Sequence, residues 1–393
     1  MTATPTIQLR DYQLDCLAAI KAAGQRGVKR MLVALPTGTG KTVLFAQLPS
    51  MIRGARGERK MLVVAHRTEL LDQAAEKIHW ANPDMAVEIE QADRHVTPNA
   101  QAIVASIQTL AMSPQRLASL QTQNIAMVVV DEAHHITAAS YLAMLNKLGL
   151  APDFAALGAD TVKQRKAALG DFKPDKSAPA LIGFTATPHR TDAVGLEAVL
   201  DEIAYSRTIE EMMRAGWLCK IKGKRIESTS DISNVRTSHG DYQEGELSSS
   251  VNTPERNDLA VKSYLALAAG RRALVFAVDV AHTQALTQAF LDQGINAAYV
   301  TGATPKETRA GIIGRYKAGQ LAVLVNCMVL TEGFDAPETD CIIMARPTKS
   351  SLLYTQMLGR GTRIALGKED MLVIDLVDIG AAGVQSVNTL FGL

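Results

Sequence analysis

Residues 35–42 read Leu35-Pro36-Thr37-Gly38-Thr39-Gly40-Lys41-Thr42. An apolar run precedes them, and the residues that follow can open a helix. A strand, a glycine loop and a helix start form the context of a phosphate-binding loop, because the glycines let backbone N–H groups close around phosphate oxygens. Lys41 would add a positive charge for the β- and γ-phosphates of a nucleotide, and Thr42 would offer a hydroxyl to Mg²⁺.

A second stretch supports the same interpretation. Asp131-Glu132-Ala133-His134 directly follows the apolar run 127–130, which predicts a buried strand. Hydrolysis of ATP needs a metal ligand, an oriented water and positive charge near the γ-phosphate. Asp131 would hold Mg²⁺, and Glu132 would orient and deprotonate the attacking water. The two stretches together predict ATP and Mg²⁺ as cofactors.

The second half of the chain contains candidates for the missing positive charge. Residues 356–363 read Gln356-Met357-Leu358-Gly359-Arg360-Gly361-Thr362-Arg363. Gln356 would help to hold the attacking water, and Arg360 and Arg363 would act as arginine fingers from a second domain. Their spacing of three residues puts both arginines on one side of a helix or turn.

Length and composition are typical of a soluble two-domain protein. The chain has 393 residues, which is enough for about two ordinary domains. Hydrophobic residues make up 47% and charged residues 21%, so a sizeable core can form. The formal net charge is only +1, so any contact with nucleic acid must come from a local groove and not from a global basic field.

The cysteines and the N-terminus indicate the compartment. The 4 cysteines stand apart with no C-x-x-C pair, which argues against a zinc site and against a disulfide framework. The first residues are neither basic nor apolar, as a signal peptide would be. No apolar run reaches about 18 residues, so no membrane span is expected. We therefore predict a cytoplasmic protein.

Short apolar runs alternate with helical patterns twice along the chain, which predicts two α/β domains with parallel sheets covered by helices on both faces. The expected strands lie near 30–35, 61–65, 102–105, 127–130, 181–185, 273–277, 297–300, 321–325, 341–344 and 371–374. We expect the boundary near 205–220, a polar insertion over 149–179, and a loop or peripheral hairpin over 228–257. Ligands of such sheets bind outside the carboxyl ends of the strands.

Taken together, these stretches resemble the superfamily 2 helicases, the DEAD/DEAH-like group. Nine short motifs occur in the order of that family, over most of the chain. They are Leu9-Arg10-Asp11-Tyr12-Gln13 (adenine motif), 36–42 (motif I), Ala65-His66-Arg67-Thr68-Glu69-Leu70 (Ia), Ser106-Ile107-Gln108-Thr109-Leu110 (Ib), 131–134 (II), Thr185-Ala186-Thr187-Pro188 (III), Leu274-Val275-Phe276-Ala277 (IV), Leu330-Thr331-Glu332-Gly333-Phe334-Asp335-Ala336-Pro337 (V) and 356–363 (VI). The resemblance implies two tandem RecA-like domains, an ATP-binding domain over 1–210 and a helicase C-terminal domain over 211–393. It also implies an ATP site in the cleft between them.

The resemblance further implies roles for individual residues. The residues expected to bind the nucleotide are Arg10, Gln13, Thr37, Gly38, Thr39, Gly40, Lys41, Thr42, Gly333 and Asp335. Those expected to contact the nucleic-acid backbone are Arg67, Gln108, Thr109, Thr301, Gly302 and Thr331. Those expected to couple the two sites are His134, Thr185 and Thr187, whereas His135 is interpreted as an ordinary neighbour. A basic cluster near the domain boundary, either a solvated face or a nucleic-acid contact, comprises Lys220, Lys222, Lys224 and Arg225.

The residue sequences of several motifs are similar to those of RadD-type bacterial DNA-repair helicases, their phage relatives, and the type I and III restriction helicase subunits. This subgroup implies work on DNA by a motor that tracks the backbone without reading the sequence. RadD-type proteins carry a cysteine-rich zinc region after motif VI, and this sequence reaches Leu393 without one. The motor is therefore expected to work with a protein partner or with a C-terminal accessory region.

We predict a nucleic-acid-stimulated ATP hydrolase that acts as a helicase or translocase on single-stranded or branched DNA, in repair, recombination or phage replication. Two alternatives stay open at this point. One is an RNA-remodelling ATPase. The other is the motor subunit of a larger, restriction-type complex that translocates without unwinding.

Overall fold

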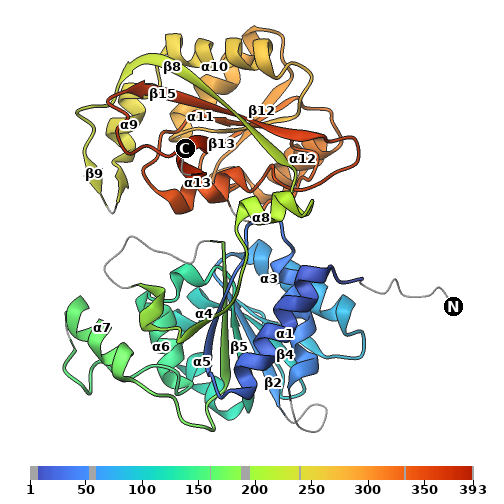
Figure 1. The fold of residues 1–393 in the computed structure, drawn as a ribbon, viewed down its shortest axis with the longest axis vertical. Helices are drawn as coiled ribbons and strands as arrows, with labels where there is room; N and C mark the ends of the chain where they lie inside the picture. Colours follow the sequence, from blue (N-terminus) through green and yellow to red (C-terminus); the bar gives the residue numbers. More distant parts are fainter. Residues whose placement is uncertain are drawn as a thin grey trace, which may run out of the picture. The chain divides into compact units, whose positions relative to one another are not determined.

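The chain folds into two compact units, each built on its own parallel sheet (Figure 1). The structure is a computed structural model that describes residues 8–52, 59–159, 161–186, 195–238, 240–331 and 333–391. The change from one unit to the other falls between Arg207 and Thr208. Within the described ranges, no helix is long and apolar enough to cross a membrane.

The first unit contains a seven-stranded sheet in the order β3-β4-β2-β5-β6-β1-β7, in which all neighbours are parallel. The strands are β1 (Arg30–Ala34), β2 (Lys60–Ala65), β3 (Val87–Glu90), β4 (Ala102–Ser106), β5 (Ile125–Val130), β6 (Ala180–Thr185) and β7 (Glu202–Ser206). The α-helices are α1 (Asp11–Gln25), α2 (Lys41–Gln47), α3 (Thr68–Ala81), α4 (Ile107–Met112), α5 (Pro114–Ser119), α6 (Ala139–Lys147) and α7 (Val162–Asp171). Short 3-10 turns are η1 (Leu48–Met51), η2 (Leu120–Thr122), η3 (Ala133–His135) and η4 (Leu196–Ala198).

The second unit contains a six-stranded sheet in the order β12-β13-β11-β14-β15-β8, again with parallel neighbours, and a small antiparallel hairpin. Its strands are β8 (Lys220–Asp231), β9 (Thr237–Ser238), β10 (Asp241–Tyr242), β11 (Ala273–Phe276), β12 (Ala297–Val300), β13 (Val323–Asn326), β14 (Cys341–Met344) and β15 (Asp370–Ile379). Its helices are α8 (Ile209–Arg214), α9 (Glu244–Val251), α10 (Pro254–Leu267), α11 (Val280–Asp292), α12 (Lys306–Lys317), α13 (Ser351–Leu358) and α14 (Val387–Leu390).

Helices bury both faces of the central strands, which is why those strands are apolar throughout. On one face of the second sheet, Leu274 and Phe276 pack with residues of α12 and α13. On the other face, Ala273 and Val275 pack with residues of α10 and α11. Alternate residues of one strand thus enter different cores, as the two-residue period of a strand requires. Each fully buried aliphatic side chain contributes roughly 1.5–3 kcal/mol relative to exposure.

The predicted fold class is confirmed, and the two parallel sheets contain three strands that the apolar pattern does not indicate. All ten expected strands are present, nine of them within two residues of the expected bounds, whereas β15 ends five residues later than expected. The additional ones are β3, β7 and β8, and each lies at or near a sheet edge. Residues 228–257, expected to form a loop or a peripheral hairpin, contain the β9–β10 hairpin, and also the end of β8, α9 and the start of α10. The polar insertion over 149–179 includes the ten-residue helix α7.

Candidate active site

The phosphate-binding loop connects β1 to α2. Gly38 and Gly40 adopt φ values of +87° and +75°, a left-handed conformation that glycine reaches without strain. Lys41 begins α2, and its Nζ donates to the Leu35 carbonyl at 3.4 Å. The same Nζ lies 3.8 Å from Glu132 Oε1, so the fold brings together the lysine of one motif and the carboxylate of another.

Asp131 and Glu132 follow β5 at the carboxyl end of the sheet. The backbone N–H of Asp131 donates to the Val64 carbonyl on neighbouring β2 at 3.0 Å, which fixes the turn. Glu132 has φ +49°, and a non-glycine residue in this region costs roughly 1–3 kcal/mol, a strain often found at functional sites. Gly183 on adjacent β6 permits the turn to approach, since a Cβ there would lie 2.8 Å from Ala133 Cβ.

The Asp131 carboxyl group is electrostatically suited to a cation. Only 7% of the residue is exposed, and burial together with the Glu132 charge raises its pKa to about 6, although Lys41 acts in the opposite direction. A divalent ion would stabilise the ionised form. Carboxylate and hydroxyl oxygens are ligands that Mg²⁺ accepts, so Asp131 and Thr42, the second residue of α2, fit the predicted metal.

Three histidines extend this site from β5 to β2. His134 Nδ1 lies 3.3 Å from Glu132 Oε2, and the His134 and His135 ring centroids are 4.1 Å apart. The His66 ring lies 4.6 Å from that of His135. The sequence predicts no special role for His135 and no individual role for His66. His66 lies beside His135 because β2 and β5 are neighbours in the sheet, so the strand order is the information needed to find this pair.

The remaining nucleotide candidates of the first unit lie on either side of the loop. Gln13 is buried on α1, and its Oε1 accepts from the Arg10 backbone N–H at 3.0 Å. A Cβ at Gly40 would lie 3.1 Å from Gln13 Nε2, so this side chain contacts the phosphate-binding loop. Thr185 ends β6, and its carbonyl accepts from Leu35 N–H at 2.9 Å. Thr187 lies outside the described residues.

The nucleic-acid candidates of the first unit follow two adjacent strands, β2 and β4. Gln108 Nε2 donates to the His66 carbonyl at 2.6 Å, and its Oε1 accepts from the Ser106 hydroxyl at 2.9 Å. Arg67 is the N-cap residue of α3, and Thr109 lies in the first turn of α4. These residues therefore share the carboxyl edge of the sheet with Asp131 and Glu132.

Motifs V and VI meet in the second unit. Arg360 Nη1 donates to the Phe334 carbonyl at 2.9 Å, and its Nε donates to the Gln356 carbonyl at 3.3 Å. The Arg363 guanidinium forms an ion pair with Asp335. Gly333, two residues before Asp335, has φ +71°. Glu332 lies outside the described residues.

The nucleic-acid candidates of the second unit follow β12 and β13. Thr301 and Thr331 are buried, and the Thr331 hydroxyl donates to the Met328 carbonyl at 2.9 Å. Gly302 is exposed. Arg309 Nη2 donates to the carbonyls of Thr301 and Gly302, both at 3.3 Å, so the loop is held from α12. Because Thr301 is buried, contacts by the loop after β12 would come from its backbone.

The basic cluster of the boundary region lies on the edge strand β8. Lys222 Nζ forms an ion pair with Asp370 Oδ2 at 2.6 Å, so one member of the cluster has a structural partner. Lys220, Lys222 and Lys224 stand at alternate positions of β8, which pairs with β15, and Arg225 follows directly.

Comparisons with known proteins identify the family. Residues 6–190 match the family described as type III restriction enzyme, res subunit, and residues 257–365 match the helicase conserved C-terminal domain. The chain is 38% identical over 394 residues to the putative ATP-dependent helicase IRC3 of Saccharomyces cerevisiae, covering 98% of this chain and 54% of that protein. The chain belongs to the superfamily 2 helicases.

Two further superfamily 2 likenesses extend over most of the chain. The DNA 3'-5' translocase XPB2 of Sulfurisphaera tokodaii is 23% identical, with 96% of this chain and 83% of that protein covered. The fragment structure of a putative HsdR subunit of a type I restriction enzyme from Vibrio vulnificus superposes with a TM-score of 0.68 at 20% identity, covering 95% of this chain and 65% of that chain. The expected likeness to restriction subunits is thereby confirmed for the fold.

The superfamily 2 assignment implies an ATP-hydrolysing enzyme that uses ATP, usually with Mg²⁺. The chain spans about half the length of IRC3. The roles of the individual site residues, and the domain limits at 210 and 211, stay predictions.

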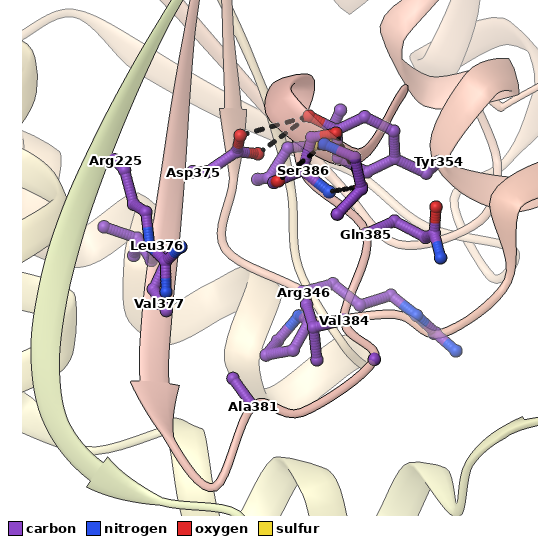
Figure 2. A pocket seen from close by; sticks show the side chains of 14 residues that line it. Arg225, Arg346, Tyr354, Asp375, Leu376, Val377, Ala381, Val384, Gln385 and Ser386 are labelled. Carbon is purple, nitrogen blue, oxygen red and sulfur yellow. Dashed lines mark hydrogen bonds between the residues drawn. The ribbon is translucent and has the colours of Figure 1, made fainter. Parts of the chain in front are cut away.

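A cavity of about 210 Å³ lies elsewhere in the second unit, at the carboxyl ends of β14 and β15 (Figure 2). The Tyr354 hydroxyl donates to both oxygens of Asp375, at 3.0 and 3.1 Å, and burial raises the pKa of that carboxyl to about 6. Asp375 Oδ2 also accepts from the Val387 N–H at 3.1 Å and so anchors α14. Arg225 of the basic cluster lines this cavity, but none of the predicted nucleotide-binding or catalytic residues does.

Proposed function

We propose that this chain is the motor of a DNA helicase or translocase, which hydrolyses ATP to ADP and phosphate and is stimulated by the nucleic acid it moves along. The observation that supports it most directly is the convergence of Lys41, Glu132 and the buried Asp131 at the carboxyl edge of one sheet. Ligand sites of open α/β sheets lie at this edge.

The chemistry follows from the positions of these groups. The backbone N–H groups of residues 37–42 and the Lys41 ammonium would bind the phosphates. Mg²⁺, when bound by Asp131 and Thr42, would neutralise charge on the β- and γ-phosphate oxygens. Glu132 would orient a water for in-line attack and accept its proton as the bond between the γ-phosphorus and the bridging oxygen breaks. His134, 3.3 Å from Glu132, would fix the orientation of that carboxylate.

Arg360 and Arg363 are the residues that the family resemblance assigns to the γ-phosphate charge. In this structure, each is held within the second unit by motif V, through Phe334 and Asp335 respectively. Arg363 must leave Asp335 before it can stabilise a phosphate. Binding of nucleotide would therefore compete with an ion pair that is present in the resting protein.

DNA is the nucleic acid we propose, because one relative that matches nearly the whole chain is named a DNA translocase. The residues that follow β2, β4 and β12 would contact its backbone, since a motor that steps along a strand cannot depend on sequence. DNA repair, recombination or phage replication is the proposed setting.

The test is the ATPase rate measured with no nucleic acid, single-stranded DNA, duplex DNA, forked DNA and RNA, at low salt. We expect strong stimulation by DNA and little by RNA. Glu132→Gln serves as the matched control, because it keeps the shape of the side chain and should bind ATP without turning it over. Stimulation by RNA alone would refute the DNA assignment, and normal turnover by Glu132→Gln would refute the role of Glu132.

A further inference from the structure

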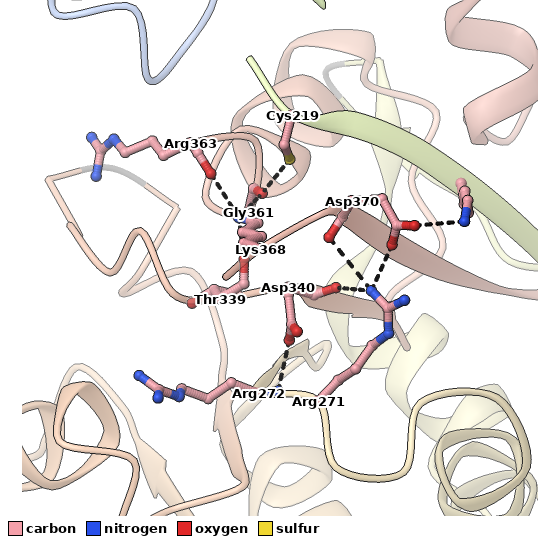
Figure 3. A network of polar contacts seen from close by, with 10 residues as sticks. Cys219, Arg271, Arg272, Thr339, Asp340, Gly361, Arg363, Lys368 and Asp370 are labelled. Carbon is pink, nitrogen blue, oxygen red and sulfur yellow. Dashed lines mark hydrogen bonds and ion pairs between the residues drawn. The ribbon is translucent and has the colours of Figure 1, made fainter. Parts of the chain in front are cut away.

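A single lysine, Lys368, binds four backbone carbonyls in the second unit. Figure 3 shows Lys368 with Gly361, Arg363 and Thr339. Lys368 Nζ donates to the carbonyls of Gly361 at 2.6 Å, Arg363 at 2.8 Å, Thr339 at 2.6 Å and Pro337 at 3.0 Å. An ammonium group has three N–H donors, so at least two of these acceptors share one. One cation therefore joins two segments, 337–339, which begins at the last residue of motif V, and 361–363 within motif VI.

The lysine is half-buried and is itself anchored. Burial lowers the pKa of Lys368, whereas Asp340 and Glu338 act in the opposite direction and Arg363 adds to the lowering. Its backbone N–H donates to the Ala365 carbonyl at 3.2 Å, and β15 begins two residues later. The carbonyl dipoles, together with Asp340 and Glu338, offset the desolvation cost of this charge.

Other contacts hold the same segments from the boundary side. The Cys219 backbone N–H donates to the Thr362 carbonyl at 2.9 Å, and Cys219 Sγ lies 3.4 Å from the Gly361 carbonyl. Nearby, Arg271 Nη1 donates to Asp370 Oδ1 at 2.8 Å and to the Asp340 carbonyl at 3.1 Å. The Lys368 carbonyl cluster is thus the centre of a polar network that fixes the loop carrying Arg363.

Arg363 is held at both of its ends. Its carbonyl accepts from Lys368, and its guanidinium pairs with Asp335. These two contacts differ in kind, because the first fixes the backbone and the second occupies the functional group. Release of Asp335 would let the guanidinium move while the backbone stays in place.

We propose that Lys368 is a positioning residue for the ATPase reaction. It fixes the backbone of motif VI relative to motif V, so that the Arg363 guanidinium can move while its backbone stays in place. This inference rests on the proposed function. A misplacement of a catalytic group by about 1 Å can lower turnover by about a hundredfold. A residue with only a general structural role would instead lower stability without changing the turnover of the folded fraction.

The experiment compares Lys368→Ala, Lys368→Gln and Lys29→Met in the full chain. Lys29 is the matched control, because its Nζ also donates to two carbonyls, of Lys176 and Ala178, both at 2.7 Å, away from the predicted site residues. Lys368→Gln keeps two N–H donors and provides a second variant if the alanine form does not fold. We measure kcat, KM for ATP, binding of ATP and thermal unfolding for each.

We expect Lys368→Ala to lose between about tenfold and a hundredfold in kcat with ATP binding unchanged, and ethylammonium chloride to restore part of the rate. Sodium chloride at equal ionic strength should not. Lys29→Met should lose stability only. Wild-type kcat in both Lys368 variants, while Arg363→Ala is inactive, would overturn the role of Lys368 alone. Absence of ATP hydrolysis by the unsubstituted chain would instead overturn the proposed function, and the role of Lys368 with it.

Discussion

Replacing Asp131 by asparagine should stabilise the first unit while abolishing its proposed metal site. The pKa of this buried carboxyl is raised from 3.8 to about 6, so the native state carries the ionised group at a cost above that pH. One pKa unit corresponds to about 1.4 kcal/mol, which gives about 3 kcal/mol at neutral pH. Asparagine keeps an oxygen that can accept the 3.0 Å hydrogen bond from Glu132 N–H.

The gain must depend on pH with a definite sign. A carboxyl whose pKa is raised in the folded state binds more protons folded than unfolded between pH 3.8 and about 6. Its destabilising effect is therefore absent below pH 3.8 and complete above about pH 6. The stability difference between Asp131→Asn and the unsubstituted chain should be largest at pH 7–8 and should vanish near pH 4.

Denaturant unfolding can follow the first unit alone. The chain has 2 tryptophans, Trp80 on α3 and Trp217, so a Trp217→Phe background leaves Trp80 fluorescence as the reporter. Asp84→Asn, at an exposed position, is the control and should change little. A gain that is equal at pH 8 and pH 4.5, or a loss of stability at pH 8, would refute the reasoning. In the same variant, ATP hydrolysis should be lost.

Three further predictions follow from the contacts. Gly40→Ala should weaken ATP binding at least about tenfold in a titration, because alanine at φ +75° is strained and its Cβ would lie 3.1 Å from Gln13 Nε2; unchanged affinity would contradict this. Glu132→Gln should bind ATP and show under about 1% of the normal rate in a phosphate-release assay, since a general base is removed. Arg256→Met should lower the free energy of unfolding by about 3–5 kcal/mol, because it leaves the fully buried Asp378 without its 2.7 Å partner; a loss below about 1 kcal/mol in chemical denaturation would argue against it.

The sequence predicts the centre of each sheet better than its edges. Strands such as β1 and β11 are continuous apolar runs because both faces are buried, and this pattern is readable directly. β8 carries lysines at alternate positions because it lies at an edge, so its sequence resembles a solvated loop. β3, with the sequence Val-Glu-Ile-Glu, is also difficult to recognise as a strand, because it too lies at an edge and carries charged residues.

The site follows the same division. Motif residues such as Lys41 and Glu132 are recognisable by type and spacing, and the order of the strands explains why they meet. His66 and His135 require knowledge that β2 and β5 are neighbours. Lys368 is invisible from the sequence, because its partners are backbone carbonyls that every residue possesses. Contacts with backbone atoms do not depend on the residue type of the partner, so they cannot be recognised from the sequence.

The pairing of β8 with β15 has a consequence for synthesis on the ribosome. β8 is the first strand of the second sheet to be made, and its hydrogen-bonding neighbour is the last. A nascent chain must therefore keep a twelve-residue strand unpaired until nearly the whole unit has emerged. Exposed unpaired strands invite association between chains, and lysines on an edge oppose it. Lys220, Lys222 and Lys224 would thus protect the growing polypeptide during the interval before its sheet can close.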